Sequence, residues 1–138
     1  MLSLLSKKIK NTLDTKEKTV FLELDLENLV NILENEKDKH VIIKFGAEWC
    51  APCKKIEPVL DECFLEMPDN VYCFNLDVDD NIEIFGKLKT KKSVKNIPVI
   101  LYYDCRKERE KWFVSDKNIS DSDPQKIIKF FEKIYKNL

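Results

Sequence analysis

The fold of this chain is decided by the stretch Phe45-Gly46-Ala47-Glu48-Trp49-Cys50-Ala51-Pro52-Cys53-Lys54. Its two cysteines stand three residues apart, after an apolar run over 41–45 and before a helical pattern of apolar residues. In open α/β sheets, reactive groups lie where the carboxyl end of a strand meets a helix. The spacing lets one sulfur attack a partner disulfide and lets the other sulfur attack back. The stretch therefore predicts disulfide exchange at a strand-to-helix junction.

The two sulfurs are expected to have unequal roles, because only a thiolate is nucleophilic and a free cysteine has a pKa near ~8.5. Unpaired N–H groups at the amino end of a helix favour the thiolate. We expect Cys50 to lie at that end, partly exposed, and Cys53 to lie one turn further on and more buried. Cys50 is then the nucleophile and Cys53 the resolving thiol. Pro52 suits the first helical turn, because it lacks an N–H.

The cysteine count bears on metal binding and on the cellular compartment. The chain has five cysteines, at Cys50, Cys53, Cys63, Cys73 and Cys105. An odd number with uneven spacing argues against a secreted disulfide framework and favours a reducing, cytoplasmic location. A zinc site would need a second pair of ligands, and His40 is the only histidine, so we predict no metal. Cys63 and Cys73 are expected to be core residues, and Cys105, in a polar stretch, to be a surface thiol.

Length and composition indicate one domain with balanced charge. The 138 residues include 43% hydrophobic and 36% charged residues, and the net charge is −1. This balance gives no basis for binding to nucleic acid or to a membrane surface, and no apolar run approaches the ~20 residues that span a bilayer. We predict an extension over residues 1–17, helical or loose at its start, before a domain over 18–138. Organellar targeting by the extension is the alternative.

Alternating patterns along the chain predict an α/β fold. Strands are predicted over 19–24, 41–45, 71–78, 99–103 and 111–114. Helices are predicted after Asp25, from the cysteine pair, over 82–92 and after Asp123, and the two aspartates are expected to cap their helices. The resulting order β-α-β-α-β-α-β-β-α predicts a central mixed β-sheet flanked by helices.

The cysteine stretch resembles the active-site segment of the thioredoxin family, whose usual form is Trp-Cys-Gly-Pro-Cys-Lys. Further along, Asn96-Ile97-Pro98 is similar to the family's loop with a cis proline, and the resemblance extends over residues 19–135. It implies a thioredoxin-like fold, in which Pro98 faces the cysteines and the backbone of Ile97 pairs with an extended substrate. It also implies a docking surface formed by Trp49, Ala51, Pro52, Ile97 and Pro98.

The sharpest departure from that family is Lys44, because its members commonly carry a buried aspartate here, beneath the second cysteine. That aspartate is thought to pass protons to and from the buried sulfur. One interpretation is that Lys44 stabilises a thiolate, which would slow resolution or make the pair a stronger oxidant. The other is that its side chain reaches solvent and changes little. Gly46 stands where many members have a larger side chain, which opens space beside the site.

The cysteine pair and the resemblance together predict a thioredoxin-type reductase of protein disulfides. The resemblance implies no bound cofactor, an external reductase such as an NADPH-dependent thioredoxin reductase, and a monomer. A second hypothesis is an interaction or adaptor subunit with weak redox turnover, which Lys44 and a lysine-rich stretch over 87–95 allow. A third, an oxidase or isomerase, is disfavoured by Pro52 and by the lack of a secretory signal pattern.

Overall fold

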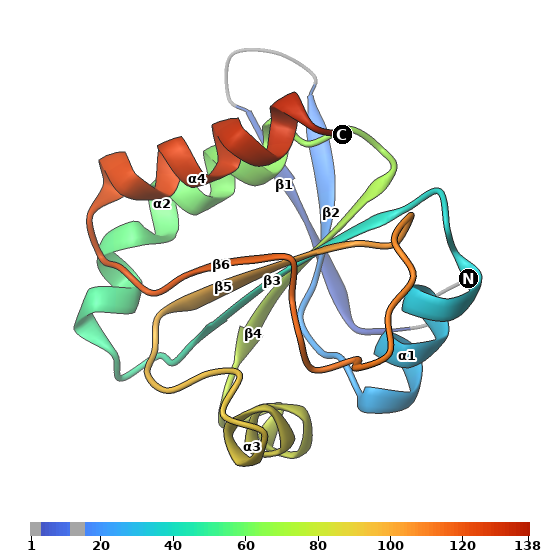
Figure 1. The fold of residues 1–138 in the computed structure, drawn as a ribbon. Helices are drawn as coiled ribbons and strands as arrows, with labels where there is room; N and C mark the ends of the chain where they lie inside the picture. The colour runs from blue at the N-terminus through green and yellow to red at the C-terminus, as the bar shows by residue number, and fades with distance from the viewer. Residues whose placement is uncertain (1–3, 12–15) are drawn as a thin grey trace.

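The computed structural model describes residues 4–11 and 16–138, and a six-stranded mixed sheet runs through the middle of these residues (Figure 1). The strands are β1 (Ser6–Lys10), β2 (Glu17–Phe21), β3 (His40–Gly46), β4 (Val71–Asp77), β5 (Val99–Asp104) and β6 (Lys117–Ile119). The helices are α1 (Leu26–Asn35), α2 (Ala51–Glu66), α3 (Ile82–Thr90) and α4 (Pro124–Lys136). The strand order is β1-β2-β4-β3-β5-β6, with β3 parallel to β4 and antiparallel to β5.

Helices cover both faces of the sheet (Figure 1). On one face, α1 and α3 share a core with Val41, Ile43 and Phe45 of β3. On the other face, the core of α2 and α4 includes Ile42. Every residue of β3 is buried, as expected for a strand covered on both sides. Because side chains alternate along a strand, Lys44 lies on the face of Ile42, beneath α2 and α4.

The predicted arrangement is confirmed, with one strand added at its amino end. The observed order is β-β-α-β-α-β-α-β-β-α, around a sheet that mixes parallel and antiparallel pairs. Asp25 accepts a hydrogen bond from the N–H of Asn28 at 2.7 Å where α1 begins. Asp123 accepts one from the N–H of Gln125 at 2.9 Å where α4 begins. Both predicted helix caps are therefore confirmed.

The segment over residues 6–10 is a strand, where the sequence predicted a helical or loose extension. All of β1 pairs antiparallel with β2. The edge of β2 presents backbone N–H and C=O groups that need partners, and β1 supplies them. The expectation was therefore wrong for these residues. The parts of it that concern residues 1–3 and 12–15 lie outside the described residues.

The strand predicted over 111–114 is a turn, in which the N–H of Val114 donates to the carbonyl of Lys111 at 3.1 Å. The last strand, β6, follows it and pairs antiparallel with β5. Trp112 and Phe113 pack against the core from this turn. Their apolar character therefore reflects packing from a loop, which the sequence pattern does not distinguish from a short strand.

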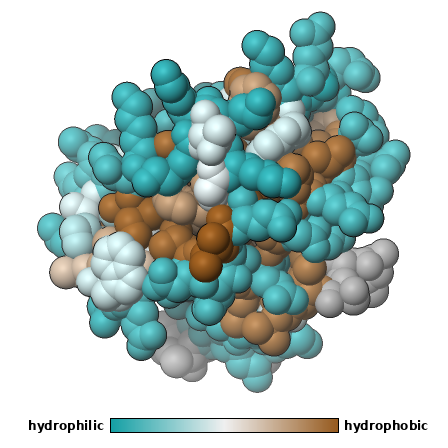
Figure 2. Space-filling view, turned by 90° about the horizontal axis from the view of Figure 1, so that it is seen from below, coloured by the Kyte–Doolittle hydropathy of each residue, from teal (hydrophilic) through white to brown (hydrophobic). Residues whose placement is uncertain are grey.

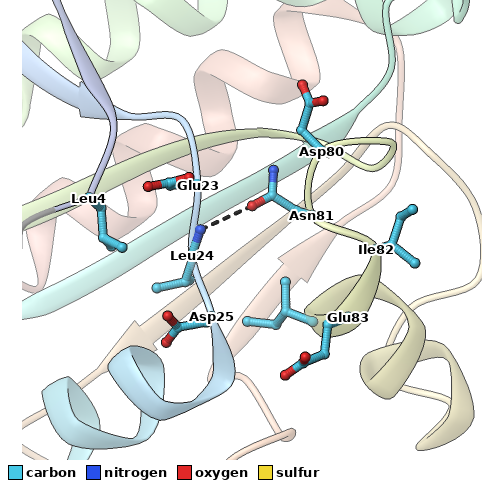
Figure 3. A pocket seen from close by; sticks show the side chains of 9 residues that line it. Leu4, Glu23, Leu24, Asp25, Asp80, Asn81, Ile82 and Glu83 are labelled. Carbon is cyan, nitrogen blue, oxygen red and sulfur yellow. Dashed lines mark hydrogen bonds between the residues drawn. The ribbon is translucent and has the colours of Figure 1, made fainter.

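Asn81 joins the start of α3 to the loop that follows β2 (Figure 3). Its Oδ1 accepts from the N–H of Leu24 at 3.0 Å, and its Nδ2 donates to the carbonyls of Leu22 and Asp77. These bonds fix the carboxyl end of β4 against the loop before α1. A cavity of about 250 Å³ lies beside them, and its acidic lining residues are Glu23, Asp25, Asp80 and Glu83.

Candidate functional site

The two cysteines lie at the start of α2 and form a disulfide, with their Cα atoms 5.3 Å apart. Cys50 is the N-cap residue of α2, and its Sγ accepts a hydrogen bond from the N–H of Cys53 at 3.3 Å. Cys50 is 6% exposed and Cys53 is 1% exposed. The predicted order of exposure is confirmed, but the expectation that Cys50 is partly exposed was wrong, because the residue is buried.

A small apolar cluster explains the burial of Cys50. Ala47 is buried together with the two cysteines, and Val78 and Ile97 pack against them. The Ile97–Pro98 peptide bond is cis, as the resemblance implied. The structure therefore brings Ile97 to the cysteines from a distant part of the chain.

Trp49, Ala51 and Pro52 are exposed next to the disulfide. Trp49 is 69% exposed, and its Nε1 donates to the carboxylate of Asp79 at 2.8 Å. This bond ties the indole ring to the segment that follows β4. Figure 2 views the molecule from the end that carries α3, where apolar side chains gather in the middle and polar side chains surround them. An apolar centre with a polar rim is typical of a surface that binds a protein.

Lys44 lies beneath α2 and is only 3% exposed. Its ammonium donates to the carboxylate of Glu57 and, at 3.2 Å, to Oδ1 of Asn75. Asn75 in turn donates from Nδ2 to the second Glu57 oxygen at 3.1 Å. Three elements, β3, α2 and β4, thus contribute to one polar triad. The interpretation in which Lys44 reaches solvent was wrong.

The triad and Cys53 border the same cavity. Lys44, Glu57, Asn75 and Cys53 line a cavity of about 250 Å³, together with Gly46. The space beside Gly46, which the sequence predicted to be open, holds the end of the Lys44 side chain. A buried ammonium is therefore a neighbour of the redox pair.

Two of the other three thiols are buried and one is partly buried, and all three are poorly ionised. Burial raises the pKa of Cys63, Cys73 and Cys105 to about 12. Cys73 lies in the core, as predicted, and Cys63 packs against it in a partly buried position. Cys105 is 0% exposed, so the expectation of a surface thiol was wrong. Its side chain turns from the polar loop into the core formed by α1 and α3.

Residues 4–11 and 16–138 contain neither a clustered metal site nor a helix that could span a membrane. No group of three or more histidine, cysteine, aspartate or glutamate side chains in these ranges is placed to hold a metal ion. No helix in them combines the length and the apolar character needed to cross a membrane.

Three residues near the cysteines were not found from the sequence. Asn75 carried a weak signal, since it is a polar residue inside an otherwise apolar strand. Glu57 stands four residues after Cys53, one helical turn away. Its partners Lys44 and Asn75 come from strands, so a local sequence pattern does not reveal its contacts. Asp79 directly follows the strand predicted over 71–78, and its bond to Trp49 is a tertiary contact that a local pattern does not reveal.

Comparisons with known proteins find relatives of this chain. The family model described as Thioredoxin matches residues 20–132. Thioredoxin of Rickettsia typhi is 33% identical over 75 residues, which are 54% of this chain and 68% of that protein. Thioredoxin of Bacillus subtilis is 44% identical over 61 residues, which are 44% of this chain and 55% of that protein. The crystal structure of thioredoxin from Trypanosoma brucei brucei has the same fold, with a TM-score of 0.63 at 24% identity over 83% of this chain and 90% of that one.

Proposed function

This chain belongs to the thioredoxin family and is a thiol–disulfide oxidoreductase, and from that premise we propose that Cys50 and Cys53 reduce disulfides in client proteins. One observation carries the proposal. The two cysteines form a disulfide at the amino end of α2, and Ile97 packs against them.

In the proposed cycle the Cys50 thiolate attacks one sulfur of a client disulfide. The Cys50–client bond forms, the client disulfide breaks, and the departing client thiolate takes a proton from water. Cys53 then gives its proton to water and attacks the Cys50 sulfur, which forms the Cys50–Cys53 bond and releases the second client thiolate. Two electrons pass from the cysteine pair to the client.

The assignment of roles follows from position. Cys50 caps α2 and accepts the N–H of Cys53, so the positive end of the helix favours its thiolate. Cys53 is 1% exposed, which denies a client disulfide direct access to its sulfur. Cys50 is therefore assigned as the nucleophile and Cys53 as the resolving thiol.

Clients are proposed to dock around the disulfide on two segments of the chain, one next to the cysteines and the other at Ile97 and Pro98. Trp49 offers an exposed ring fixed by Asp79, and Ile97 packs against the cysteines, where its backbone is adjacent to an arriving client. The proposed docking residues are Trp49, Ala51, Pro52, Ile97 and Pro98.

The oxidised pair must be reduced again by an external donor, because one catalytic cycle leaves a Cys50–Cys53 disulfide. We assign this step to an NADPH-dependent thioredoxin reductase, and no cofactor bound to this chain is required. The consumption of NADPH by such a reductase, with this protein as substrate, tests the assignment. A rate equal to that of the reductase alone would contradict it.

Lys44 is proposed to modulate the rate or the reduction potential of the pair. A buried ammonium near a sulfur favours the ionised thiol, and a stabilised reduced form makes the pair a stronger oxidant. Lys44→Asp is expected to lower the reduction potential or to speed turnover. If neither quantity changes, Lys44 has no such role.

The remaining proposals concern the chain as a whole. Residues 18–138 are assigned as the redox domain and residues 1–17 as its extension. The protein is proposed to act as a monomer in the cytoplasm. A chain that begins at residue 18 should keep its disulfide-reducing activity. Organellar targeting by the extension is the alternative, and a fluorescent protein carrying residues 1–17 distinguishes the two locations.

Reduction of insulin by dithiothreitol tests the proposed function. The protein is expected to accelerate the reaction well above the rate with dithiothreitol alone, and Cys50→Ser is expected to abolish the acceleration. Cys105→Ser serves as the matched control, because this thiol has no part in the cycle. A background rate with both active-site cysteines intact would favour the adaptor subunit.

A further inference from the structure

Two residues of β3 meet beneath the start of α2. Lys44 and Gly46 are two positions apart on the strand, so both face α2. A Cβ built on Gly46 would lie 2.6 Å from Lys44 Nζ and 2.9 Å from Lys44 Cε. The end of the lysine side chain therefore occupies the place that any larger residue at position 46 would fill.

The same place borders the resolving cysteine. The Cβ built on Gly46 would lie 3.3 Å from Cys53 Cβ. The ammonium of Lys44 and the side chain of Cys53 are thus neighbours across one small space, which both of them line. A positive charge placed here lies close to the sulfur in buried surroundings, because Lys44 is 3% exposed and Cys53 is 1% exposed.

The ammonium is anchored from the other side by Glu57 and Asn75. Glu57 comes from the first turns of α2, and Asn75 is the residue of β4 directly opposite Lys44 in the sheet. Each accepts a hydrogen bond from Lys44, and Asn75 also donates to Glu57. Glu57 and Asn75 thus anchor the ammonium while the missing side chain of Gly46 gives it room.

We propose that Gly46 is a positioning residue of the redox pair, because the space left by its missing side chain lets the Lys44 ammonium lie beside Cys53. The inference rests on the proposed function, in which this pair cycles between dithiol and disulfide. In this position the Lys44 ammonium stabilises an ionised sulfur in the reduced form, and it has no such effect on the neutral disulfide. Displacing it therefore shifts the couple toward the disulfide.

Gly46→Ala is the direct test, read out by the equilibrium of the full-length protein with reduced and oxidised glutathione. The glycine φ is not positive, so alanine fits the backbone, and its Cβ collides chiefly with the flexible end of Lys44. We expect the equilibrium to move about threefold toward the disulfide, which is ~14 mV for a two-electron couple. The matched control is Gly86→Ala, where an added Cβ meets nothing within 4 Å, and it should not shift the equilibrium.

A double variant distinguishes displacement of the Lys44 ammonium from a direct effect of the added methyl group on Cys53. In a Lys44→Met background no ammonium remains to be displaced, so adding Gly46→Ala should cause no further shift. Lys44→Gln replaces Lys44→Met if the latter does not unfold cooperatively. The ultraviolet absorbance of the thiolates, followed against pH, should show a raised cysteine pKa in Gly46→Ala relative to the wild type, and no further rise when Gly46→Ala is added to Lys44→Met.

Two results would overturn the proposal. One is an unchanged glutathione equilibrium in Gly46→Ala. The other is an equal shift of that equilibrium with and without Lys44, which would mean that the added methyl group acts by contacting Cys53 directly. Failure of the proposed function looks different, since the wild-type protein would then reach no reversible equilibrium with glutathione at all.

Discussion

At the scale of single residues, Cys50 and Cys53 differ in their surroundings more than in their depth. Both are buried, but Cys50 caps a helix and receives an N–H bond, whereas Cys53 borders the cavity that holds the Lys44 ammonium. In the proposed cycle, the helix end acts on the sulfur that meets the client, and the buried cation acts on the sulfur that resolves the mixed disulfide. Each step of the proposed cycle therefore has its own electrostatic control.

Brief treatment of the reduced protein with iodoacetamide at pH 7 is expected to modify Cys50 first. Burial raises the pKa of Cys63, Cys73 and Cys105 to about 12, so these thiols are almost fully protonated and react slowly. Peptide mass mapping at increasing times measures the order of modification. Labelling of any of these three thiols ahead of Cys50 would contradict the assignment.

The chemistry of the cysteine pair could be predicted from sequence, but the triad beneath it could not. The spacing of Cys50 and Cys53 is local, and so is the identity of Ile97 and Pro98 in their loop. The contacts of Lys44 depend on which strand and which helix turn pack against it. A local pattern does not contain this information, and so the two interpretations of Lys44 stayed open until the fold was known.

At the scale of elements, the connection between α2 and β4 is held by a lysine from a neighbouring strand. Lys18 of β2 is 9% exposed. Its ammonium donates to the carbonyls of Pro68 and Val71, each at 2.8 Å, and to that of Met67 at 3.4 Å. Met67 is the C-cap residue of α2, Pro68 follows it, and Val71 is the first residue of β4. Lys18 therefore joins the end of α2 to the sheet.

Lys18→Met is expected to lower the free energy of unfolding by about 2 kcal/mol, because buried carbonyls lose a charged donor. Urea unfolding followed by circular dichroism measures the loss. Lys8→Met is the matched control, since its side chain is 67% exposed and its contact with Glu17 spans 3.4 Å. An exposed pair of this kind contributes about 0.5 kcal/mol or less. Equal losses in the two variants would contradict the role of Lys18.

Most elements were predictable because their signals are local. The caps Asp25 and Asp123 fix where two helices begin, and the β-branched run of β3 marks a buried strand. The errors fell where tertiary contacts decide. Trp112 and Phe113 fill the core from a turn, and β1 is a strand because the edge of β2 is there to pair with it.

At the scale of the whole molecule, β3 joins two polar centres through the sheet. Its carboxyl end leads to the redox pair, and its amino end carries His40, which is 1% exposed. The Nδ1 atom of His40 lies 2.8 Å from the hydroxyl of Tyr102 and 3.8 Å from Asp104. Burial lowers the pKa of His40 and outweighs the opposite effect of the Asp104 carboxylate. The histidine is therefore held neutral in the folded protein.

This histidine makes stability depend on pH. The imidazole binds a proton more tightly in the unfolded chain than in the folded one. Its contribution to the free energy of unfolding is therefore complete above about pH 6.5 and is lost as the pH drops below that value. We expect a lower urea midpoint at pH 5.5 than at pH 7.5, and a smaller difference in His40→Gln. The chain has no other histidine to titrate in this window. An equal difference in the variant would contradict the assignment.

Trapping of a mixed disulfide tests the proposal that Cys50 attacks the client and Cys53 resolves the mixed disulfide. Reduced Cys53→Ser protein is mixed with a client disulfide such as insulin, and the product is digested and mapped by mass spectrometry without reductant. A stable mixed disulfide on Cys50 is expected, and none is expected when Cys50→Ser is used in the same way. A client held on Cys53 in Cys50→Ser, or no trapped client on Cys50, would contradict it.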